Sequence, residues 1–301
     1  ARLGELFPGT RAVVVDSLFD IAETARPSFP WIRHDFAGTT LDGRHYAFGY
    51  AKANRFARVF QDDGVRLSIE PYDGPMTGDA VTEQLWYAQR SWPFYSGGGF
   101  GLLAGVRGDF TAEVDISAAV ASQATMCELA AVNVDPAAHR AEVPTSARHQ
   151  AGFYDPHGAP PFVGAEHDED DGYRINWNLG SSYDANQYGP PVGDGSVLAA
   201  RLRLDRRGPY FAAHYRNDAD ATDWVCLGAV RNDSMNPVVY LRVAGKRWRQ
   251  ERDDGNGFFP VVANDFVFTN FAVDRVRPRV QPPAAATGAA SLRLFEQDHP
   301  R

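Results

Sequence analysis

Hydrophobic and polar residues alternate along much of the chain from residue 32 onward. In residues 108–117, GDFTAEVDIS, apolar side chains stand at 110, 112, 114 and 116, and polar ones stand between them. This period of two is typical of a β-strand with one buried face and one solvated face. Similar strand-like segments, separated by turn-forming Asp, Asn and Gly, recur along the chain. They are 32–37, 45–50, 55–61, 65–70, 83–91, 99–106, 109–116, 125–134, 148–154, 173–179, 197–205, 210–216, 223–230, 238–244 and 265–273.

Closely spaced strands without long helical patterns between them predict an all-β protein, built as a two-sheet antiparallel sandwich or a barrel. We expect one β domain at 32–275, an N-terminal extension at 1–31 and a Pro/Ala-rich C-terminal tail at 276–301. Two long loops are expected at 135–147 and 155–172. The second contains the acidic run EHDEDDG, which lacks the spacing of an EF-hand and is interpreted as a solvated loop.

Composition narrows the function classes. The chain has 301 residues and a net charge of −8, which argues against a nucleic-acid partner. It contains no run of eighteen apolar residues, so no membrane-spanning helix is predicted. Cys127 and Cys226 each lie in an apolar run, and we interpret them as two buried thiols rather than a disulfide. Neither zinc-ligand spacing nor a Rossmann, P-loop or Gly-x-Ser-x-Gly motif is present.

Several segments together resemble the concanavalin A-like lectin/glucanase superfamily: HDFAGTTLDGRHYAF, DDGVRLSIEP, GDFTAEVDIS, the hairpin at 198–228 and NDFVFTNFAV. The resemblance spans roughly residues 32–275. It implies a jelly-roll sandwich of two curved antiparallel sheets, one of which carries a concave groove for a glycan. That superfamily contains hydrolases, lyases and non-catalytic binding domains, and a structural Ca²⁺ is common in it.

Glu113 and Asp115 are the first candidate catalytic residues. Side chains two positions apart on a strand share a face at roughly 6.5–7 Å, and glycoside hydrolysis uses two carboxyl groups. The laminarinase-like hydrolases of the superfamily carry a Glu-x-Asp-x-x-Glu strand. Here Glu113 and Asp115 match its first two positions, but Ala118 stands at the third. Glu128, on the following strand, could supply the missing acid if the strand register places it opposite. The alternative is that both carboxylates are simply solvated.

Candidate substrate-binding residues lie in two further segments. The stretch 83–99 is rich in aromatic residues that could stack on sugar rings, with an arginine that could bind hydroxyl groups or a uronate. In 173–179, polar side chains occupy one face of a predicted strand. His149 is a candidate base for a lyase. The candidate binding residues are Trp86, Arg90, Trp92, Tyr95, His149, Arg174, Asn176 and Asn178.

These features predict a secreted or periplasmic carbohydrate-active protein, with a glycoside hydrolase as the leading hypothesis. A non-catalytic glycan-binding domain and a polysaccharide lyase are the alternatives. The expected partner is a polysaccharide or oligosaccharide. No cofactor is expected to be required, and a structural Ca²⁺ is implied only by the resemblance.

Overall fold

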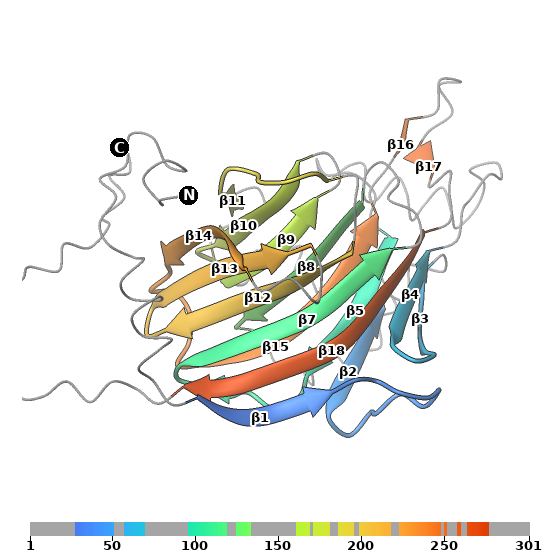
Figure 1. The fold of residues 1–301 in the computed structure, drawn as a ribbon, viewed down its shortest axis with the longest axis horizontal. Helices are drawn as coiled ribbons and strands as arrows, with labels where there is room; N and C mark the ends of the chain where they lie inside the picture. Colours follow the sequence, from blue (N-terminus) through green and yellow to red (C-terminus); the bar gives the residue numbers. More distant parts are fainter. Residues whose placement is uncertain are drawn as a thin grey trace, which may run out of the picture.

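All regular elements in the described part of the chain are β-strands, so the predicted all-β fold is confirmed. The computed structural model describes residues 28–50, 57–69, 96–118, 125–133, 161–168, 171–180, 186–195, 199–217, 223–247, 250–251, 258–259 and 264–276. Two eight-stranded antiparallel sheets pack face to face as a sandwich (Figure 1). A separate two-stranded sheet pairs β16 (Gln250–Glu251) with β17 (Phe258–Phe259). None of these elements is a helix that could cross a membrane.

The first sheet, sheet A, lies toward the viewer in Figure 1. Strand β18 pairs with β7 along one side, and with β4 and β1 in succession along the other. The strands run in the order β14 (Val225–Arg231), β13 (Tyr210–Arg216), β12 (Ala199–Arg207), β7 (Phe110–Ala118), β18 (Asn264–Val276), β4 (Val65–Ile69) and β3 (Ala57–Gln61), with β1 (Ser28–His34) beside β18.

The second sheet, sheet B, packs behind the first. Its centre is formed by β8, β9 and β15, and β6 adds a short pairing at the end of β15. The strands run in the order β11 (Gln187–Tyr188), β10 (Gly172–Asn178), β9 (Phe162–Asp168), β8 (Thr125–Val132), β15 (Val238–Arg247), β5 (Ser96–Leu102) and β2 (Tyr46–Tyr50), with β6 (Val106–Arg107) beside β15.

Strand β7 shows how the alternating pattern produces the core. Phe110, Val114 and Ile116 are at most 2% exposed and point between the sheets. The polar residues between them are half-buried on the outer face of sheet A. Each fully buried large apolar side chain stabilises the fold by about 1.5–3 kcal/mol, so register errors that would expose this face are strongly disfavoured.

Aromatic contacts join the two sheets at both ends of the core. At one end, Phe100 of β5 packs edge-on against Phe271 of β18, with ring centroids 5.4 Å apart. At the other, Tyr173 of β10 stacks on Tyr215 of β13 at 3.9 Å, with ring planes 7° apart. Because each pair spans the sandwich, these contacts fix how the sheets sit against each other.

The predicted loop at 155–172 is wrong over part of its length. Residues 162–168 form β9, a central strand of sheet B in which every residue is buried. Polar residues lie on both faces of β9, with His167 on the inner face and Glu166 on the outer face. The sequence of this strand therefore lacks the regular alternation of apolar and polar residues. Strand β1 also begins at Ser28, inside the segment assigned to the N-terminal extension. The strands predicted at 83–91 and 148–154 lie outside the described residues.

Stability should depend on the protonation of His167, which packs in the core against Tyr173. Burial lowers the pKa of His167 from 6.5 to about 4, although the backbone of Gly195 and the charge of Asp194 oppose this shift. Between these two pH values the unfolded chain binds a proton that the folded chain does not. The free energy of unfolding should therefore fall by up to about 3 kcal/mol as the pH drops from 6.5 to 4.

Urea denaturation at pH 7 and pH 4.5 measures this loss, and the variant His167→Leu should show a smaller difference between the two pH values. Equal differences in the variant and the original protein would assign the acid sensitivity to other groups.

Candidate functional site

The outer face of sheet B carries a row of charged and polar side chains across four strands. In the strand register, Ala244 of β15, Glu128 of β8, Glu166 of β9 and Arg174 of β10 lie side by side. Directly opposed residues of antiparallel strands point to the same face, with Cβ atoms about 4.5–5.5 Å apart. The register therefore brings two glutamates together as immediate neighbours.

Asn176 links these two glutamates. Its side-chain amide donates to Glu166 Oε2, and to Glu128 Oε2 at 3.4 Å. It reaches them across Gly164, which stands opposite Asn176 on β9. A Cβ atom on residue 164 would lie 2.5 Å from Asn176 Oδ1 and 3.3 Å from Glu128 Oε2. The glycine therefore leaves the space in which the three polar side chains meet.

Glu128 is 1% exposed and forms an ion pair with Arg242 of β15. Two charges removed from water in this way are stable only when they are paired and hydrogen-bonded. Arg242 and the Asn176 amide together satisfy that requirement for Glu128. The negative charge of Glu128 is therefore neutralised by Arg242.

Arg174 holds three carboxylates at once. Its guanidinium contacts Glu166 at 2.7 Å and Asp168 at 2.9 Å, and it also pairs with Asp171. Burial alone would lower the pKa of Arg174, but these carboxylates outweigh it and raise the pKa above its usual value. The guanidinium lies 4.2 Å from the centre of the Tyr188 ring. Tyr188 is 41% exposed, so the site reaches the surface at this edge.

Four predicted site residues lie together on this face: Glu128, Arg174, Asn176 and Asn178. Three of them share the contacts just described. Asn178 instead binds the segment that follows β10. Its amide donates to Asn186 Oδ1 at 2.7 Å, and its Oδ1 accepts from the Gly180 backbone at 2.6 Å. The other candidate binding residues, Trp86, Arg90, Trp92, Tyr95 and His149, lie outside the described residues.

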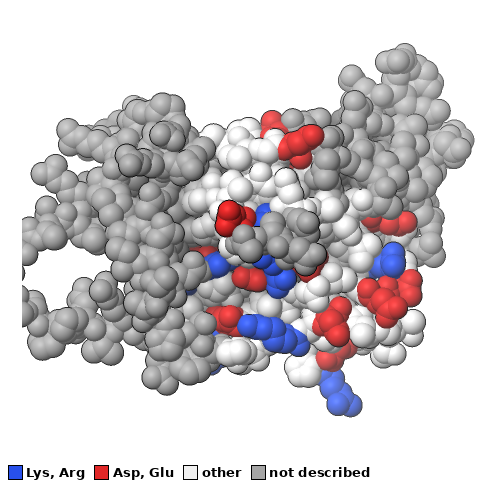
Figure 2. Space-filling model, viewed as in Figure 1, with Lys and Arg blue, Asp and Glu red and all other residues white. Residues whose placement is uncertain are grey.

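Glu113 and Asp115 lie on the opposite side of the sandwich, on the outer face of sheet A. Strand β8 pairs with β9 and β15, so its Glu128 is not brought opposite them. Arg201 of β12 contacts Glu113 at 2.9 Å and Asp115 at 3.5 Å. Figure 2 shows acidic and basic side chains next to one another on this face. The expected grouping of all three carboxylates in one groove is therefore not present.

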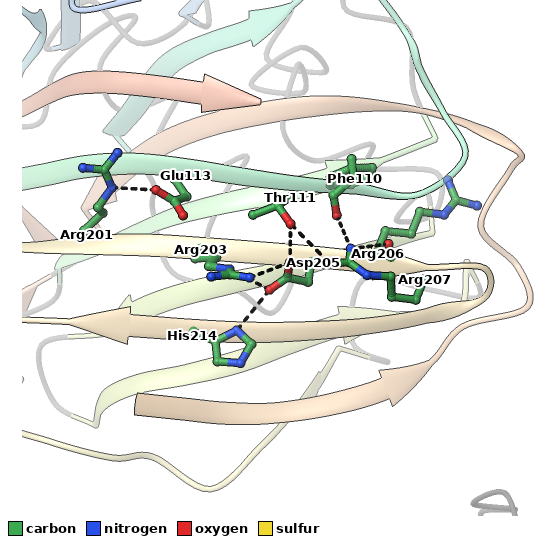
Figure 3. A network of polar contacts seen from close by, with 9 residues as sticks. All are labelled: Phe110, Thr111, Glu113, Arg201, Arg203, Asp205, Arg206, Arg207 and His214. Atoms are coloured by element: carbon green, nitrogen blue, oxygen red, sulfur yellow. Dashed lines mark hydrogen bonds and ion pairs between the residues drawn. The ribbon is translucent and has the colours of Figure 1, made fainter. Parts of the chain in front are cut away.

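The pKa of Glu113 is raised, chiefly by burial and also by the charge of Asp205, against the opposing effect of Arg201. Figure 3 shows Glu113 directed at Arg201. The charged partner of Glu113 is thus Arg201 in the same sheet. This ion pair serves as a control for the ion-paired carboxylates of sheet B.

Sequence reasoning missed Glu166, Asp168 and Asp171, because their acidic segment was interpreted as a loop. The sequence nevertheless contains a pattern that could have identified these residues. Residues 166–171 read Glu-x-Asp-x-x-Asp, which matches the expected Glu-x-Asp-x-x-Glu pattern apart from an aspartate at the last position. Residues 162, 164, 166 and 168 also share one face of β9, and residues 163, 165 and 167 lie on the other. Within the described residues, no group of three or more His, Cys, Asp or Glu side chains is placed to hold a metal ion.

Fold and site together define an all-β sandwich protein with a buried, ion-paired carboxylate cluster on one outer sheet face. No family model and no curated protein matches the chain. Among solved structures, it is similar to a protein of unknown function with a galectin-like fold from Bacillus subtilis (13% identity, TM-score 0.47, covering 84% of this chain and 100% of that chain).

Two further similar structures are an immunostimulatory antigen and pseudo β-1,3-glucanase of Mycobacterium tuberculosis (12% identity, TM-score 0.47, 81% and 98% covered) and a LamA variant from Z. galactanivorans in complex with laminaritriose and laminaritetraose (11% identity, TM-score 0.48, 82% and 98% covered). These similarities concern the fold, and the function proposed below rests on the residues of this chain.

Proposed function

We propose that this chain is a carbohydrate-active protein, specifically a retaining glycoside hydrolase, whose site is the outer face of β8, β9 and β10. The supporting observation is the opposed pair Glu128 and Glu166. Both accept hydrogen bonds from one amide nitrogen of Asn176, which limits the separation of their Oε2 atoms to about 6 Å. Retaining glycosidases use two carboxyl groups about 5–5.5 Å apart.

The surroundings suggest a role for each glutamate. Arg174 contacts Glu166 at 2.7 Å and favours its charged form, as a nucleophile requires. Glu166 would attack the anomeric carbon while Glu128 gives its proton to the departing glycosidic oxygen. Water would then release the sugar, with Glu128 acting as base. Asp171 is the competing acid/base, because it occupies the last position of the Glu-x-Asp-x-x-Asp pattern and its side chain is 48% exposed.

Tyr188 would contact the sugar at the exposed edge of the site. Its ring is held in place by the Arg174 guanidinium on β10, and aromatic faces stack on the apolar faces of sugar rings. Tyr188→Ala should weaken glycan affinity by about 1–2 kcal/mol, or roughly 5- to 30-fold in Kd, and Tyr188→Phe should retain most of it. Isothermal titration calorimetry with the glycan found in the digestion panel measures the affinities of both variants. Equal affinity in the alanine variant and the original protein would place the sugar elsewhere.

A second candidate function, non-catalytic glycan binding, is favoured by one specific observation. Every carboxylate of the cluster has an arginine partner: Arg242 for Glu128, and Arg174 for the other three. A general acid must carry a proton, and a neighbouring arginine favours the deprotonated form. A site built this way could bind a sugar without cleaving it.

A digestion panel tests the proposal. The purified protein is incubated with neutral β-glucans, xylans, arabinans and polyuronates, and products are scored by reducing ends and by the ultraviolet absorbance of unsaturated sugars. New reducing ends without absorbance support the hydrolase. Absorbing products would instead indicate a lyase. Retention on one glycan in affinity electrophoresis without any products would support the binding function.

A further inference from the structure

A second row of side chains runs across the outer face of sheet B, next to the row that contains the two glutamates. In the strand register, Ala130 of β8, Gly164 of β9 and Asn176 of β10 lie side by side, and Tyr188 of β11 follows Asn176. Each is two residues along its strand from the row of the glutamates or opposite such a residue, so all share the outer face. The middle of this row is low, because its side chains are a methyl group and a hydrogen atom.

An apolar wall borders this row on the side away from the glutamates. Val132 of β8 and Phe162 of β9 stand opposite each other in the next row, and they pack with Ala130 in a small apolar cluster. The low row therefore lies between carboxylates on one side and apolar side chains on the other. A sugar ring, which has apolar C–H faces and a rim of hydroxyl groups, fits such a boundary.

Asn176 is the polar member of the row, and its contacts fix the orientation of its amide. The amide nitrogen donates to Glu166 Oε2 and to Glu128 Oε2. An ionised carboxylate such as Glu166 only accepts hydrogen bonds, so the nitrogen must face the glutamates and the oxygen must lie on the other side. The oxygen lies over Gly164, where a Cβ atom would be 2.5 Å from it.

Asn176 Oδ1 has no hydrogen-bond partner among the described residues, although Asn176 is only 3% exposed. A buried polar atom without a partner is rare, because it has lost its contacts with water and gained nothing in return. An unpaired acceptor beside both carboxylates is a place for a donor on a ligand. Tyr188 stands opposite Asn176 and is 41% exposed, so the row reaches the surface at this end.

We propose that Asn176 determines the specificity of the glycoside hydrolase proposed above, an inference that rests on that function: Asn176 Oδ1 accepts a hydrogen bond from the 2-hydroxyl of the sugar being cleaved. Because the amide contacts both glutamates, its oxygen lies close to the position of the anomeric carbon, and the 2-hydroxyl is the ring hydroxyl next to that carbon. Hydrogen bonds to this hydroxyl strengthen in the transition state. The substrate class is therefore a glycan whose cleaved unit carries an unsubstituted 2-hydroxyl.

The test uses aryl glycosides of the sugar found in the digestion panel, made with and without the 2-hydroxyl. The measured quantity is the ratio of kcat/KM for the hydroxyl substrate to kcat/KM for the 2-deoxy substrate. Asn176→Ala should lower this ratio roughly ten- to hundredfold relative to the original protein. The intrinsic reactivities of the two substrates cancel in this comparison. If Asn176 only positioned the glutamates, both substrates would lose rate equally, and the unchanged ratio would overturn the proposal.

Two further variants separate this contact from a general disturbance of the site. Gly164→Ala keeps Asn176 and both glutamates, but its new methyl group would lie 2.5 Å from Asn176 Oδ1 and displace it. It should lower the ratio in the same direction, and it carries the test if Asn176→Ala fails to fold. Tyr188→Ala is the control: it should weaken both substrates equally and leave the ratio unchanged. An equal fall of the ratio in all three variants would overturn the proposal.

The hydrolase and the 2-hydroxyl contact can fail separately. Hydrolysis by the original protein, with the same ratio in Asn176→Ala and Gly164→Ala, would remove the contact and leave the hydrolase. If the panel shows binding without hydrolysis, the hydrolase fails, and the ratio is measured instead as affinities for the glycan unit and its 2-deoxy analogue. A preference for the 2-hydroxyl that disappears in Asn176→Ala would then support the contact. A protein that neither cleaves nor binds any glycan would overturn both.

Discussion

Glu166→Gln is expected to lower the rate of glycan hydrolysis by about 10⁴-fold or more while leaving the sandwich folded and still able to bind glycan. Loss of a nucleophile typically has this magnitude. Glutamine keeps the shape of Glu166 and can still accept the Asn176 hydrogen bond. Arg174 retains Asp168 and Asp171 as partners, so the ion-pair cluster loses one member rather than collapsing. Initial rates of reducing-end release, with binding measured in parallel, check the result.

Azide identifies the role of the residue. In Glu166→Ala, which leaves space for a small anion where the carboxylate stood, azide should restore turnover and give a glycosyl azide of inverted configuration, whereas rescue of a truncated acid/base variant gives retained configuration. Glu128→Ala and Asp171→Ala should be compared in this way, since only one of them can be the acid/base.

Glu113→Gln is the control, because Glu113 is also a carboxylate paired with an arginine on an outer sheet face, with a side chain that is 23% exposed where that of Glu166 is 2% exposed. It should hydrolyse at nearly the original rate. Equal losses in Glu113→Gln and Glu166→Gln would point to a general loss of folding. Full activity in Glu166→Gln would remove this residue from the mechanism.

The fold could be predicted because its information is local. In β7, residues 110–116 alternate without interruption, and their apolar members are the ones buried. Where the alternation is less regular the prediction was wrong. In β9, Glu166 and Asp168 are buried on the outer face by ion pairs with Arg174, and the sequence cannot show that a charge will be neutralised by a partner on another strand.

The site was only partly predictable because it depends on strand pairing. Glu113 and Glu128 lie on consecutive long strands, β7 and β8, yet these belong to different sheets. A hairpin between them would have placed the two carboxylates together, and nothing in the local pattern distinguishes a hairpin from a crossover. Arg174 and Asn176 were predicted correctly to share a face, since two positions on one strand need only the period of β10.

Arg242→Met is expected to lower the free energy of unfolding by about 3–5 kcal/mol, a large fraction of the stability of a single domain. Arg242 forms the ion pair with Glu128, and both side chains are at most 5% exposed. Without it, Glu128 keeps, among the described residues, only the Asn176 contact at 3.4 Å, and no described cation remains paired with its buried charge. Urea denaturation at pH 7 measures the loss.

The double variant Glu128→Gln/Arg242→Met should recover much of that loss, because it removes the unpaired charge together with its partner. Arg33→Met is the surface control: Arg33 pairs with Asp274 but its side chain is 51% exposed, and its loss should cost at most about 1 kcal/mol. If Arg242→Met proved no more destabilising than Arg33→Met, Glu128 would have to be reached by water.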